Sequence, residues 1–389
     1  MKIFKNIRVN GNPLLTANGL FMSILISSSF FFSGCKKEIS QPESDTLSEV
    51  SKASPKSKAP DIIVHSGGSI QAAVDAASEG QIIRIEEGTY HEAIVVNKPG
   101  IQLMGADANT VIIENPGDED NGITVQDNGD GFVLKDVTVQ NFGENGVYLT
   151  HADNFLLSHV ITINNGEYGL FPVFCKNGIV EHCSATGHTD TGIYIGQSGS
   201  ILLEHNVAFA NVNGLEIENC TDVTVSKNHS YENVSGLTVV LLPGLTVKTS
   251  SNILITDNHI ENNNLVNVPK GGGFEDFVPS GSGILLVGVD NATIKNNKIS
   301  NNNFTGIATV STVILGALAG LPPEAFGDIE PNVDGARIIN NTLVNNGSAP
   351  PVGLPLPGVD FLWDGNGINN CWKNNTYSTS YPSPLPACN

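Results

Sequence analysis

The 389-residue sequence predicts an all-β fold, a single-domain right-handed parallel β-helix with coils of about 22–24 residues. The first observation is a glycine that recurs at nearly constant spacing, at Gly122, Gly146, Gly169, Gly192, Gly214, Gly236, Gly283 and Gly306. The second is that apolar and other residues alternate after each glycine, which is typical of strands with one buried face. The third is a second apolar stretch about eight residues later in most repeats. Together they indicate coils stacked into a solenoid.

The segments before the first repeat are expected to begin this solenoid. Residues 69–79 are predicted to form a helix that caps the open N-terminal end, because their apolar residues share one helical face. Short strands are expected to follow at 82–85, 94–96, 101–104 and 111–113. Insertions interrupt the later coils at 241–251, 265–282 and 311–333. Insertions in a solenoid form loops that often carry binding sites.

One bend between strands is rich in asparagine, which tolerates left-handed backbone geometry. Its column comprises Asn206, Asn228, Asn258, Asn297 and Asn341. Stacked amides can hydrogen-bond to one another, so we predict a structural ladder. Cys183 takes the same register one coil earlier, which favours a small bend-filling residue over a reactive thiol.

The first 34 residues are predicted to be a bacterial lipoprotein signal peptide. A basic start at Lys2, Lys5 and Arg8 precedes an apolar stretch that is too short to span a bilayer. It ends in Phe-Ser-Gly-Cys35, which resembles a lipobox, so lipidation of Cys35 is expected. The alternative is an ordinary secretory signal cleaved nearby. The protein is therefore expected to be exported and lipid-anchored to the bacterial cell envelope, at the outer membrane, facing the periplasm or the outside.

Three further parts are predicted after the signal peptide. Residues 35–60 form a flexible tether rich in Ser, Lys, Pro and Glu, residues 61–346 form the β-helix, and residues 347–389 form a Pro-rich C-terminal cap. Cys371 and Cys388 are placed to form a disulfide in the cap. Cys175 and Cys220 share a register but lie two coils apart, which is too far for a disulfide. A monomer is expected.

The charge of the chain restricts its partners. The formal net charge is −20, and removal of the signal peptide, which has three basic and no acidic residues, makes it −23. No arginine occurs between Arg84 and Arg337. This acidity excludes nucleic acid as a partner and argues against anionic polymers.

An acidic and aromatic set of residues flanks the recurring glycines and is expected to stack on one sheet face; we call it the acidic–aromatic face. Tyr148, Phe171, Tyr194 and Glu216 stand two residues after their glycines, Glu218 two further on, and Glu144, Glu167 and Asp190 two residues before. Stacked carboxylates repel one another, which leaves three possibilities. The repulsion raises the pKa values of the carboxyl groups, the column binds a cation such as calcium, or the carboxylates are simply solvated. The catalytic candidates are Asp190, Tyr194, Glu216, Glu218 and His188. The binding candidates are Tyr148, Tyr168, Phe171, Gln197, Ser198, Glu144 and Glu167.

A histidine column offers a different chemistry. His159, His182 and His205 each lie 13 residues after a glycine in consecutive coils, and Glu181 and Glu204 precede two of them. Imidazoles on adjacent coils can share a transition metal. The alternative is a set of exposed stacked histidines without a ligand.

Three runs of sequence carry a family resemblance. They are YGLFPVFC at 168–175, TDTGIYIGQS at 189–198 and NGLEIEN at 213–219. From about residue 60 to 345 the chain resembles exported parallel β-helix-repeat proteins of unestablished function, in the pectate-lyase-like superfamily. The resemblance implies an exported protein and a c-type cytochrome-like partner. It points first to Tyr168, Cys175, Asp190, Tyr194, Gln197, Ser198, Glu216 and Glu218, and the chain departs from the family pattern at Phe171, Phe174 and Thr191.

The leading functional prediction is a lipid-anchored envelope protein that binds a glycan or protein partner, as a scaffold, through the acidic–aromatic face. The first alternative is a carbohydrate-active enzyme with its site on that face. The scarcity of basic residues in the coils weakens a lyase, and the sequence lacks the Asp-Pro-His motif of epimerases. A hydrolase needs two suitably spaced carboxylates, which the face can supply. The second alternative is metal handling through the histidine column.

Overall fold

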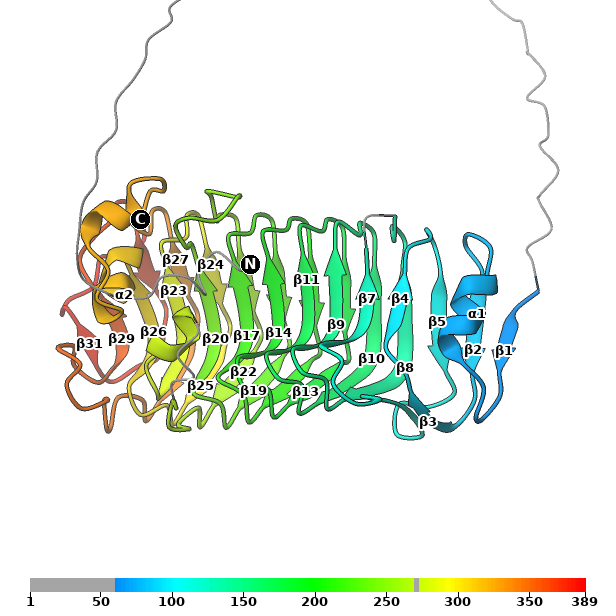
Figure 1. Ribbon diagram of the computed structural model, residues 1–389. Coiled ribbons are helices and arrows are strands. Elements are labelled where there is room, and N and C mark those ends of the chain that lie inside the picture. The colour runs from blue at the N-terminus through cyan, green and yellow to red at the C-terminus, as the bar shows by residue number, and fades with distance from the viewer. Residues whose placement is uncertain (1–59, 127, 269–272) are drawn as a thin grey trace, which may run out of the picture. The chain divides into compact units, whose positions relative to one another are not determined.

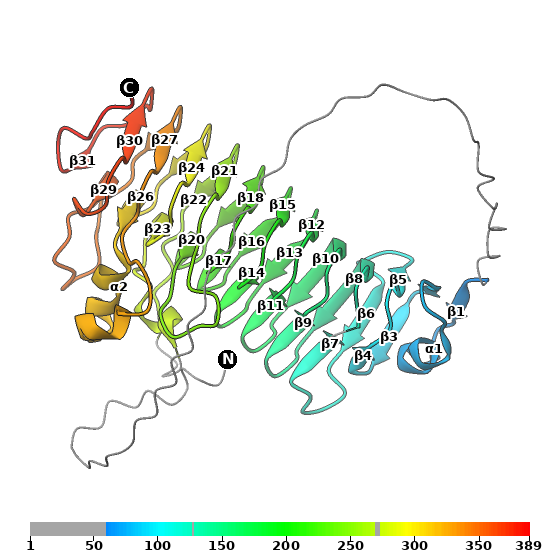
Figure 2. The same ribbon diagram turned by 90° about the horizontal axis from the view of Figure 1, so that it is seen from above.

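The computed structural model describes residues 60–126, 128–268 and 273–389; the predicted signal peptide, Cys35 and the predicted tether up to residue 59 lie outside them. The described part is a parallel β-helix, as predicted, with its coils stacked along one axis (Figures 1 and 2). Each coil pairs in parallel with the next. None of the described helices has the length and apolar character needed to span a membrane.

The recurring glycines begin the strands of one sheet, which we call the glycine sheet. Among the described residues it has 11 strands. They are β4 (Ile94–Val96), β7 (Asn121–Val125), β9 (Asn145–Thr150), β11 (Tyr168–Val173), β14 (Thr191–Gly196), β17 (Asn213–Glu218), β20 (Ser235–Val240), β23 (Ser282–Val287), β26 (Thr305–Val310), β29 (Val359–Trp363) and β31 (Ser380–Tyr381).

The remaining described strands form a second sheet, the return sheet, in two rows. The rows share the long strands β8 (Val133–Gln140) and β10 (Leu156–Ile163). The first row also contains β1 (Ile62–Val64), β2 (Ile82–Ile85), β5 (Gln102–Gly105), β12 (Ile179–Glu181), β15 (Leu202–Glu204), β18 (Thr224–Ser226), β21 (Leu254–Thr256), β24 (Thr293–Lys295), β27 (Arg337–Ile339) and β30 (Cys371–Lys373). The second row also contains β3 (Gly88–His91), β6 (Val111–Glu114), β13 (Ser184–Thr186), β16 (Val207–Phe209), β19 (His229–Tyr231), β22 (His259–Glu261), β25 (Lys298–Ser300) and β28 (Thr342–Val344).

The core lies between the two sheets and follows the predicted alternation. The first and third residues after each glycine point inward, and the six that the pattern identified most clearly are fully buried: Val147, Leu149, Ile193, Ile195, Leu215 and Ile217. The second residue therefore points away from the core, because successive side chains of a strand lie on opposite faces. This places the acidic and aromatic side chains on the outer face of the glycine sheet.

A helix, α1 (Ile70–Ala76), lies within the predicted range at the N-terminal end of the described solenoid (Figure 1). Its apolar face joins the core. Glu92 accepts hydrogen bonds from the first backbone N–H groups, and Lys98 Nζ donates to three carbonyls at the other end. A carboxylate at the N-terminus and an ammonium at the C-terminus both complement the helix dipole.

The predicted asparagine ladder is confirmed. The backbone N and Nδ2 of Asn228 donate to Oδ1 of Asn258 at 2.9 and 3.0 Å, and Asn258 does the same to Asn297 at 2.9 Å. Cys183 donates its backbone N–H to Asn206, so it shares the ladder register. The left-handed residue is the one before each ladder position, such as Lys227 with φ 54°. The ladder asparagines therefore stabilise the bend through hydrogen bonds of their side-chain amides, and not by adopting a left-handed backbone conformation.

A second ladder, which the sequence analysis did not identify, runs between the return sheet and the glycine sheet. It contains Asn165, Asn211, Asn233, Asn263, Asn302 and Asn346. His188 occupies one rung: its backbone N donates to Asn211 Oδ1 at 3.0 Å, and its Nδ1 accepts from Asn165 N at 3.2 Å. The two ladders fix the register of successive coils on both sides of each turn.

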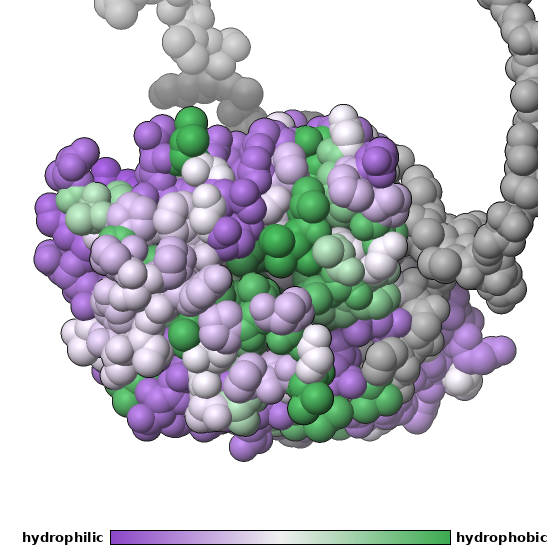
Figure 3. Space-filling view, turned by 90° about the vertical axis from the view of Figure 1, so that its left-hand side faces the viewer, coloured by the Kyte–Doolittle hydropathy of each residue, from purple (hydrophilic) through white to green (hydrophobic). Residues whose placement is uncertain are grey.

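The predicted Pro-rich cap at 347–389 contains further coil strands, so the boundary at 346 does not end the solenoid. Strand β29 pairs with β26, and β30 pairs with β27. The predicted disulfide between Cys371 and Cys388 is present. Viewed from the C-terminal end, apolar side chains gather near the middle of a largely polar surface (Figure 3). Phe361 of β29 and Trp372 of β30 belong to the hydrophobic core.

Two of the three predicted insertions cover the C-terminal half of the glycine sheet. The insertion after β20 and the insertion after β26, which contains α2 (Thr312–Leu318) and a 3-10 helix (Pro323–Phe326), are joined by hydrogen bonds such as Thr312 Oγ1 to the Leu241 carbonyl. The outward side chains beneath them are apolar and buried: Val240, Leu285, Val287 and Val310. The third insertion contains a 3-10 helix, Phe274–Phe277.

Candidate functional site

The strand register confirms that the predicted residues stack on the outer face of the glycine sheet. Phe171 is the register partner of Tyr148, and Glu216 is the partner of Tyr194. Glu216 in turn pairs with Thr238. Acidic side chains thus follow aromatic ones along a single column. The acids lie next to the apolar region that the insertions cover.

Glu216 and Glu218 each accept a hydrogen bond from the neighbouring strand β14, and Glu216 accepts a second one from its own strand. The Tyr194 hydroxyl on β14 donates to Glu218 Oε1 at 2.7 Å. Thr191 Oγ1 lies 2.5 Å from Glu216 Oε2, and Asn213 Nδ2 donates to the same oxygen at 3.1 Å. These contacts fix both carboxyl groups, because each partner side chain belongs to a strand with a defined register.

Asp190 joins this cluster from the bend before β14. Its Oδ1 lies 3.0 Å from Thr191 Oγ1, and the Tyr168 hydroxyl is a second hydrogen-bond partner. Thr191 has one hydroxyl hydrogen and faces a carboxyl oxygen of both Asp190 and Glu216. Two ionised carboxylates would leave one of these contacts without a hydrogen. The geometry therefore favours a proton on one of the two acids.

Burial of the three acids and repulsion between their charges both raise their pKa values. Asp190, Glu216 and Glu218 are only 7%, 9% and 8% exposed. Burial, and then the neighbouring charge of Glu218, raises the pKa of Glu216 to about 8; burial also raises the pKa of Glu218 to about 7. Burial raises the pKa of Asp190 well above its usual range, with the charge of Glu216 adding to it. Burial outweighs the hydrogen bonds to all three groups.

A fourth carboxyl comes from the insertion before β23. Glu275, in the 3-10 helix of that loop, adds negative charge near Asp190, Glu216 and Glu218, and burial raises its own pKa. The ion pairs formed by described lysine, arginine and histidine side chains involve other acids. We call Asp190, Glu216, Glu218 and Glu275, with Tyr194, the acid cluster.

An aromatic group borders the acid cluster on its N-terminal side. Phe171 stacks on Tyr148 at a centroid distance of 5.4 Å and on Tyr168 at 4.4 Å, and it packs against Tyr194 at 4.8 Å. These rings belong to one apolar cluster with Val173. Tyr168, Phe171 and Tyr194 are buried, whereas Tyr148 is partly exposed, so Tyr148 is the ring of these four that a ligand can reach.

Three of the sequence candidates have structural roles instead. His188 lies in the second ladder, where its Nε2 contacts Thr162 Oγ1 at 3.0 Å, and burial lowers its pKa to about 4. Gln197 accepts two backbone hydrogen bonds from the loop after β20, at Thr246 and Val247. Ser198 accepts from Cys175 N at 2.9 Å in a bend column with Cys220. Their polar atoms stabilise bends, so they are not brought into the acid cluster.

Glu144 and Glu167 stack before Asp190 as predicted. The backbone N of Glu167 donates to the Glu144 carbonyl at 2.6 Å, and Asp190 N donates to the Glu167 carbonyl at 3.1 Å. Both glutamates are partly exposed, whereas Asp190 is buried. Of these three acids, Asp190 is the one whose side chain contacts Tyr168 and Thr191.

The histidine column stacks as predicted. The rings of His159 and His182 lie 5.0 Å apart and those of His182 and His205 lie 4.8 Å apart. All three residues have positive φ, a conformation in which histidine is enriched, so the bend itself accounts for their residue type. Among the described residues, the groups of three donors close enough to share a metal ion do not include this column or the acid cluster.

The sequence analysis missed Thr191, Asn213 and Glu275 as parts of the acid cluster. Thr191 and Asn213 each stand immediately before a repeat glycine, so the constant offset that identified Tyr194 and Glu216 could have identified them. Glu275 lies in an insertion without a repeat register. Only a three-dimensional structure could place it.

Comparison with known proteins agrees with this architecture. A family model described as "Right handed beta helix region" matches residues 121–264. The chain is a right-handed parallel β-helix. No curated protein is similar to this β-helix at the level of sequence.

Solved structures resemble the right-handed β-helix over most of its length. The A-module of the mannuronan C-5 epimerase AlgE4 from Azotobacter vinelandii is 18% identical, with a TM-score of 0.58, over 80% of this chain and 93% of that one. The AlgE6 A-module of the same organism is 18% identical, with a TM-score of 0.56, over 80% of this chain and 94% of that one. The enzymatically active domain of tailspike protein 2 from bacteriophage CBA120 is 12% identical, with a TM-score of 0.50, over 78% of this chain and 44% of that one. At these identities the likeness extends to the fold.

Proposed function

We propose that this β-helix is a carbohydrate-active enzyme and that the acid cluster is its catalytic centre. The observation that carries the proposal is the pair Glu216 and Glu218, two carboxyl groups on one strand with separately defined hydrogen bonds and raised pKa values. Groups whose pKa values lie near neutral pH are suited to proton transfer. Acidic residues that only make a surface soluble are normally exposed, whereas Glu216 and Glu218 are buried.

The two carboxyls are suited to different roles. Glu216, with a pKa of about 8, holds its proton at neutral pH and can donate it to a leaving oxygen. Glu218, with a pKa of about 7, is closer to ionisation and can act as the base, oriented by the Tyr194 hydroxyl. One carboxyl that keeps its proton and a second that ionises more readily are what hydrolysis of a glycosidic bond requires, so this reaction fits best.

The charge of the site restricts the substrate. The described ionisable groups of the acid cluster are carboxyls and tyrosines, so an anionic sugar would be repelled. A neutral polysaccharide, with one sugar ring stacked on the partly exposed Tyr148, is the substrate class we infer. The fold likeness to two mannuronan C-5 epimerase modules accords with a polysaccharide, while the specificity rests on this chain's own residues.

A panel assay tests the proposal. The purified full chain is incubated with neutral and acidic polysaccharides, with and without calcium, and new reducing ends, unsaturated products and binding are recorded together. We expect new reducing ends from a neutral polysaccharide and their loss in Glu216→Gln and Asp190→Asn. Glu204→Gln, on the return sheet, is the matched control and should keep the native rate.

Two other outcomes would change the assignment. Unsaturated products that require calcium would indicate a lyase acting on an acidic glycan bridged by the ion. Binding without turnover would favour a glycan-binding scaffold, for which the partly exposed ring of Tyr148 supplies a contact surface. Export and lipid anchoring at Cys35 remain proposals, which mass spectrometry of the mature N-terminus tests.

A further inference from the structure

A second pair of stacked histidines lies on the return sheet, on a different face from the acid cluster. His229 on β19 and His259 on β22 are register partners, and their rings stack at 4.8 Å with planes 7° apart. Glu261 follows two residues after His259, so its side chain lies on the same face of the strand. Its carboxylate reaches both rings: Nε2 of His229 is 3.1 Å from Oε1, and Nε2 of His259 is 3.5 Å from Oε2.

These three side chains bring two imidazole nitrogens and a carboxylate oxygen together. One donor atom from each residue lies within 4.8 Å of the other two. The side chains of His229, His259 and Glu261 are 39%, 46% and 25% exposed, so an ion in solution can reach them. Two histidines and one carboxylate are a ligand set that suits divalent transition metals. We propose that His229, His259 and Glu261 form a binding site for a divalent transition-metal ion such as Zn²⁺ or Cu²⁺.

The sheet holds this ligand set in place. Tyr231, the register partner of Glu261, packs its ring against His229 at 4.6 Å, and Phe209 stacks on Tyr231 at 5.2 Å. The parallel register fixes the separation of the two histidines at one coil. A bound ion draws the two Nε2 atoms to about 3–4 Å from each other, given metal–nitrogen bonds of about 2.0–2.1 Å. Rotation of these partly exposed side chains supplies that movement.

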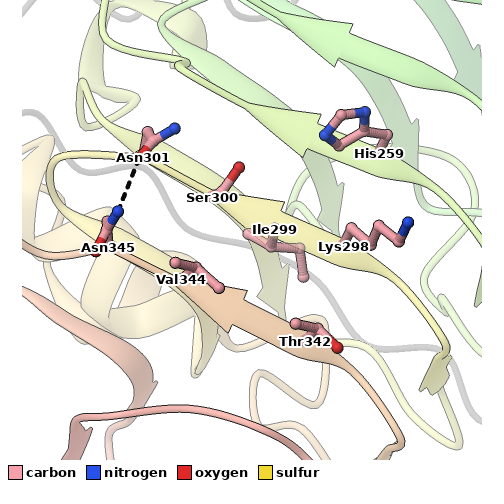
Figure 4. Close-up of a pocket in the computed structure, with 8 residues that line it drawn as sticks. All are labelled: His259, Lys298, Ile299, Ser300, Asn301, Thr342, Val344 and Asn345. Atoms are coloured by element: carbon pink, nitrogen blue, oxygen red, sulfur yellow. Dashed lines mark hydrogen bonds between the residues drawn. The ribbon is translucent and has the colours of Figure 1, made fainter.

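The site ends at the next coil. Lys298 is the register partner of His259 on β25, and its ammonium group has no lone pair to offer a metal. Figure 4 shows His259 and Lys298 on neighbouring strands beside a pocket of about 320 Å³, with Asn301 and Asn345 at its far end. The pocket leaves room for water to complete the coordination of an ion bound at His259.

The histidine column of the sequence analysis provides an internal comparison. His159, His182 and His205 stack at similar distances. There Glu204 Oε2 lies 3.6 Å from Nδ1 of its chain neighbour His205, one ring of the column. At His229 and His259 one carboxylate contacts both rings. Stacking alone is therefore common to both groups, and the shared carboxylate distinguishes the proposed metal site.

Metal titration tests the proposal. The full chain, purified without a polyhistidine tag and stripped with a chelator, is titrated with Zn²⁺ by calorimetry at neutral pH and with Cu²⁺ by electron paramagnetic resonance. We expect one high-affinity ion per chain and nitrogen coupling in the Cu²⁺ spectrum. His259→Ala and Glu261→Gln should each weaken binding by about tenfold or more.

His182→Ala is the matched control, because it removes one stacked histidine without a shared carboxylate. It should bind Zn²⁺ with native affinity. Circular dichroism of each variant checks that the fold is intact. Three results would overturn the proposal: no Zn²⁺ binding by the native chain, native affinity in His259→Ala, or loss of binding in His182→Ala.

Discussion

The hydroxyl of Tyr194 donates a 2.7 Å hydrogen bond to Oε1 of Glu218, and the two residues come from adjacent strands of the glycine sheet. The register partner of Glu218 on β14 is Gly196, and a Cβ at this position would overlap the Tyr194 hydroxyl. The missing side chain at 196 thus makes room for the ring to lean along its own strand and reach the carboxylate. In the proposed mechanism this contact orients the base.

The first prediction concerns this contact. Tyr194→Phe removes the donor, and Gly196→Ala displaces the ring; each should lower glycan turnover by about 10²-fold or more, the scale of positioned acid–base catalysis. Tyr231→Phe, a tyrosine change on the return sheet, should leave turnover unchanged. Initial rates on the substrate found in the panel measure all three. Native rates in both Tyr194→Phe and Gly196→Ala would show that Glu218 needs no orientation from Tyr194.

The second prediction is a loss of stability as the pH rises. Folded Glu216 and Glu218 keep their protons up to pKa values of about 8 and about 7, whereas the unfolded chain releases them near 4.5. Between these values the folded state binds more protons, so the free energy of unfolding falls as the pH increases. At about 1.4 kcal/mol per pKa unit, the two groups together give an expected fall of about 6 kcal/mol between pH 5 and about pH 8.

Urea denaturation at a series of pH values checks this. Glu216→Gln keeps a neutral side chain at every pH, so its unfolding free energy should vary less across the same range. A native profile that is flat between pH 5 and 8, or a profile of Glu216→Gln that matches the native one, would contradict the raised pKa of Glu216.

The third prediction has the opposite sign and concerns His188. Burial lowers its folded pKa to about 4 from an ordinary 6.5, so below pH 6.5 the unfolded state takes up the proton first. His188 therefore contributes stability that is present above pH 6.5 and is lost as the pH falls toward 4. His188→Asn continues the second ladder between Asn165 and Asn211 and should remove this loss. The test is the change in thermal unfolding midpoint between pH 7 and pH 5, measured for the native protein and for His188→Asn. An equal change in the two proteins would contradict the lowered pKa of His188.

The fourth prediction concerns the first asparagine ladder. Asn258 accepts two hydrogen bonds from Asn228 and donates to Asn297 and to the Val225 carbonyl. Asn258→Ala leaves buried N–H groups of Asn228 without an acceptor, which should cost about 2–5 kcal/mol of unfolding free energy. Asn109→Ala, at an exposed turn, should change it by less than about 0.5 kcal/mol. Urea midpoints of both variants provide the test, and a similar small effect in each would refute the structural role of the ladder.

The sequence was most informative where the coils are regular. A constant offset from each glycine placed Tyr148, Phe171, Tyr194 and Glu216 in one column, and the strand register agrees. The same offset applies to buried and exposed residues alike, so it could not tell that Asp190 is buried and Glu144 is partly exposed. That difference arises from the rings and loops packed around each position.

The errors of interpretation have physical causes. His188 is a catalytic candidate in the sequence because, with Asp190, it comes nearest to the Asp-Pro-His motif of epimerases. It nevertheless stands four residues before Gly192, just as Asn165 stands four residues before Gly169. That shared offset marks a ladder position. The C-terminal coils escaped notice because prolines and loops break their spacing, while β29 still continues the register of β26. The carboxylate that contacts both His229 and His259 was missed because the insertion at 241–251 separates those two coils in sequence.

The most direct test of the central claim is the release of new reducing ends from a neutral polysaccharide by the native chain and by Glu216→Gln, measured side by side near pH 7. If Glu216 donates the proton to the leaving oxygen, the native chain cleaves the polymer and the variant is slower by about 10²-fold or more. Equal rates in the two proteins, or no cleavage of any neutral polysaccharide by the native chain, would contradict a catalytic acid cluster.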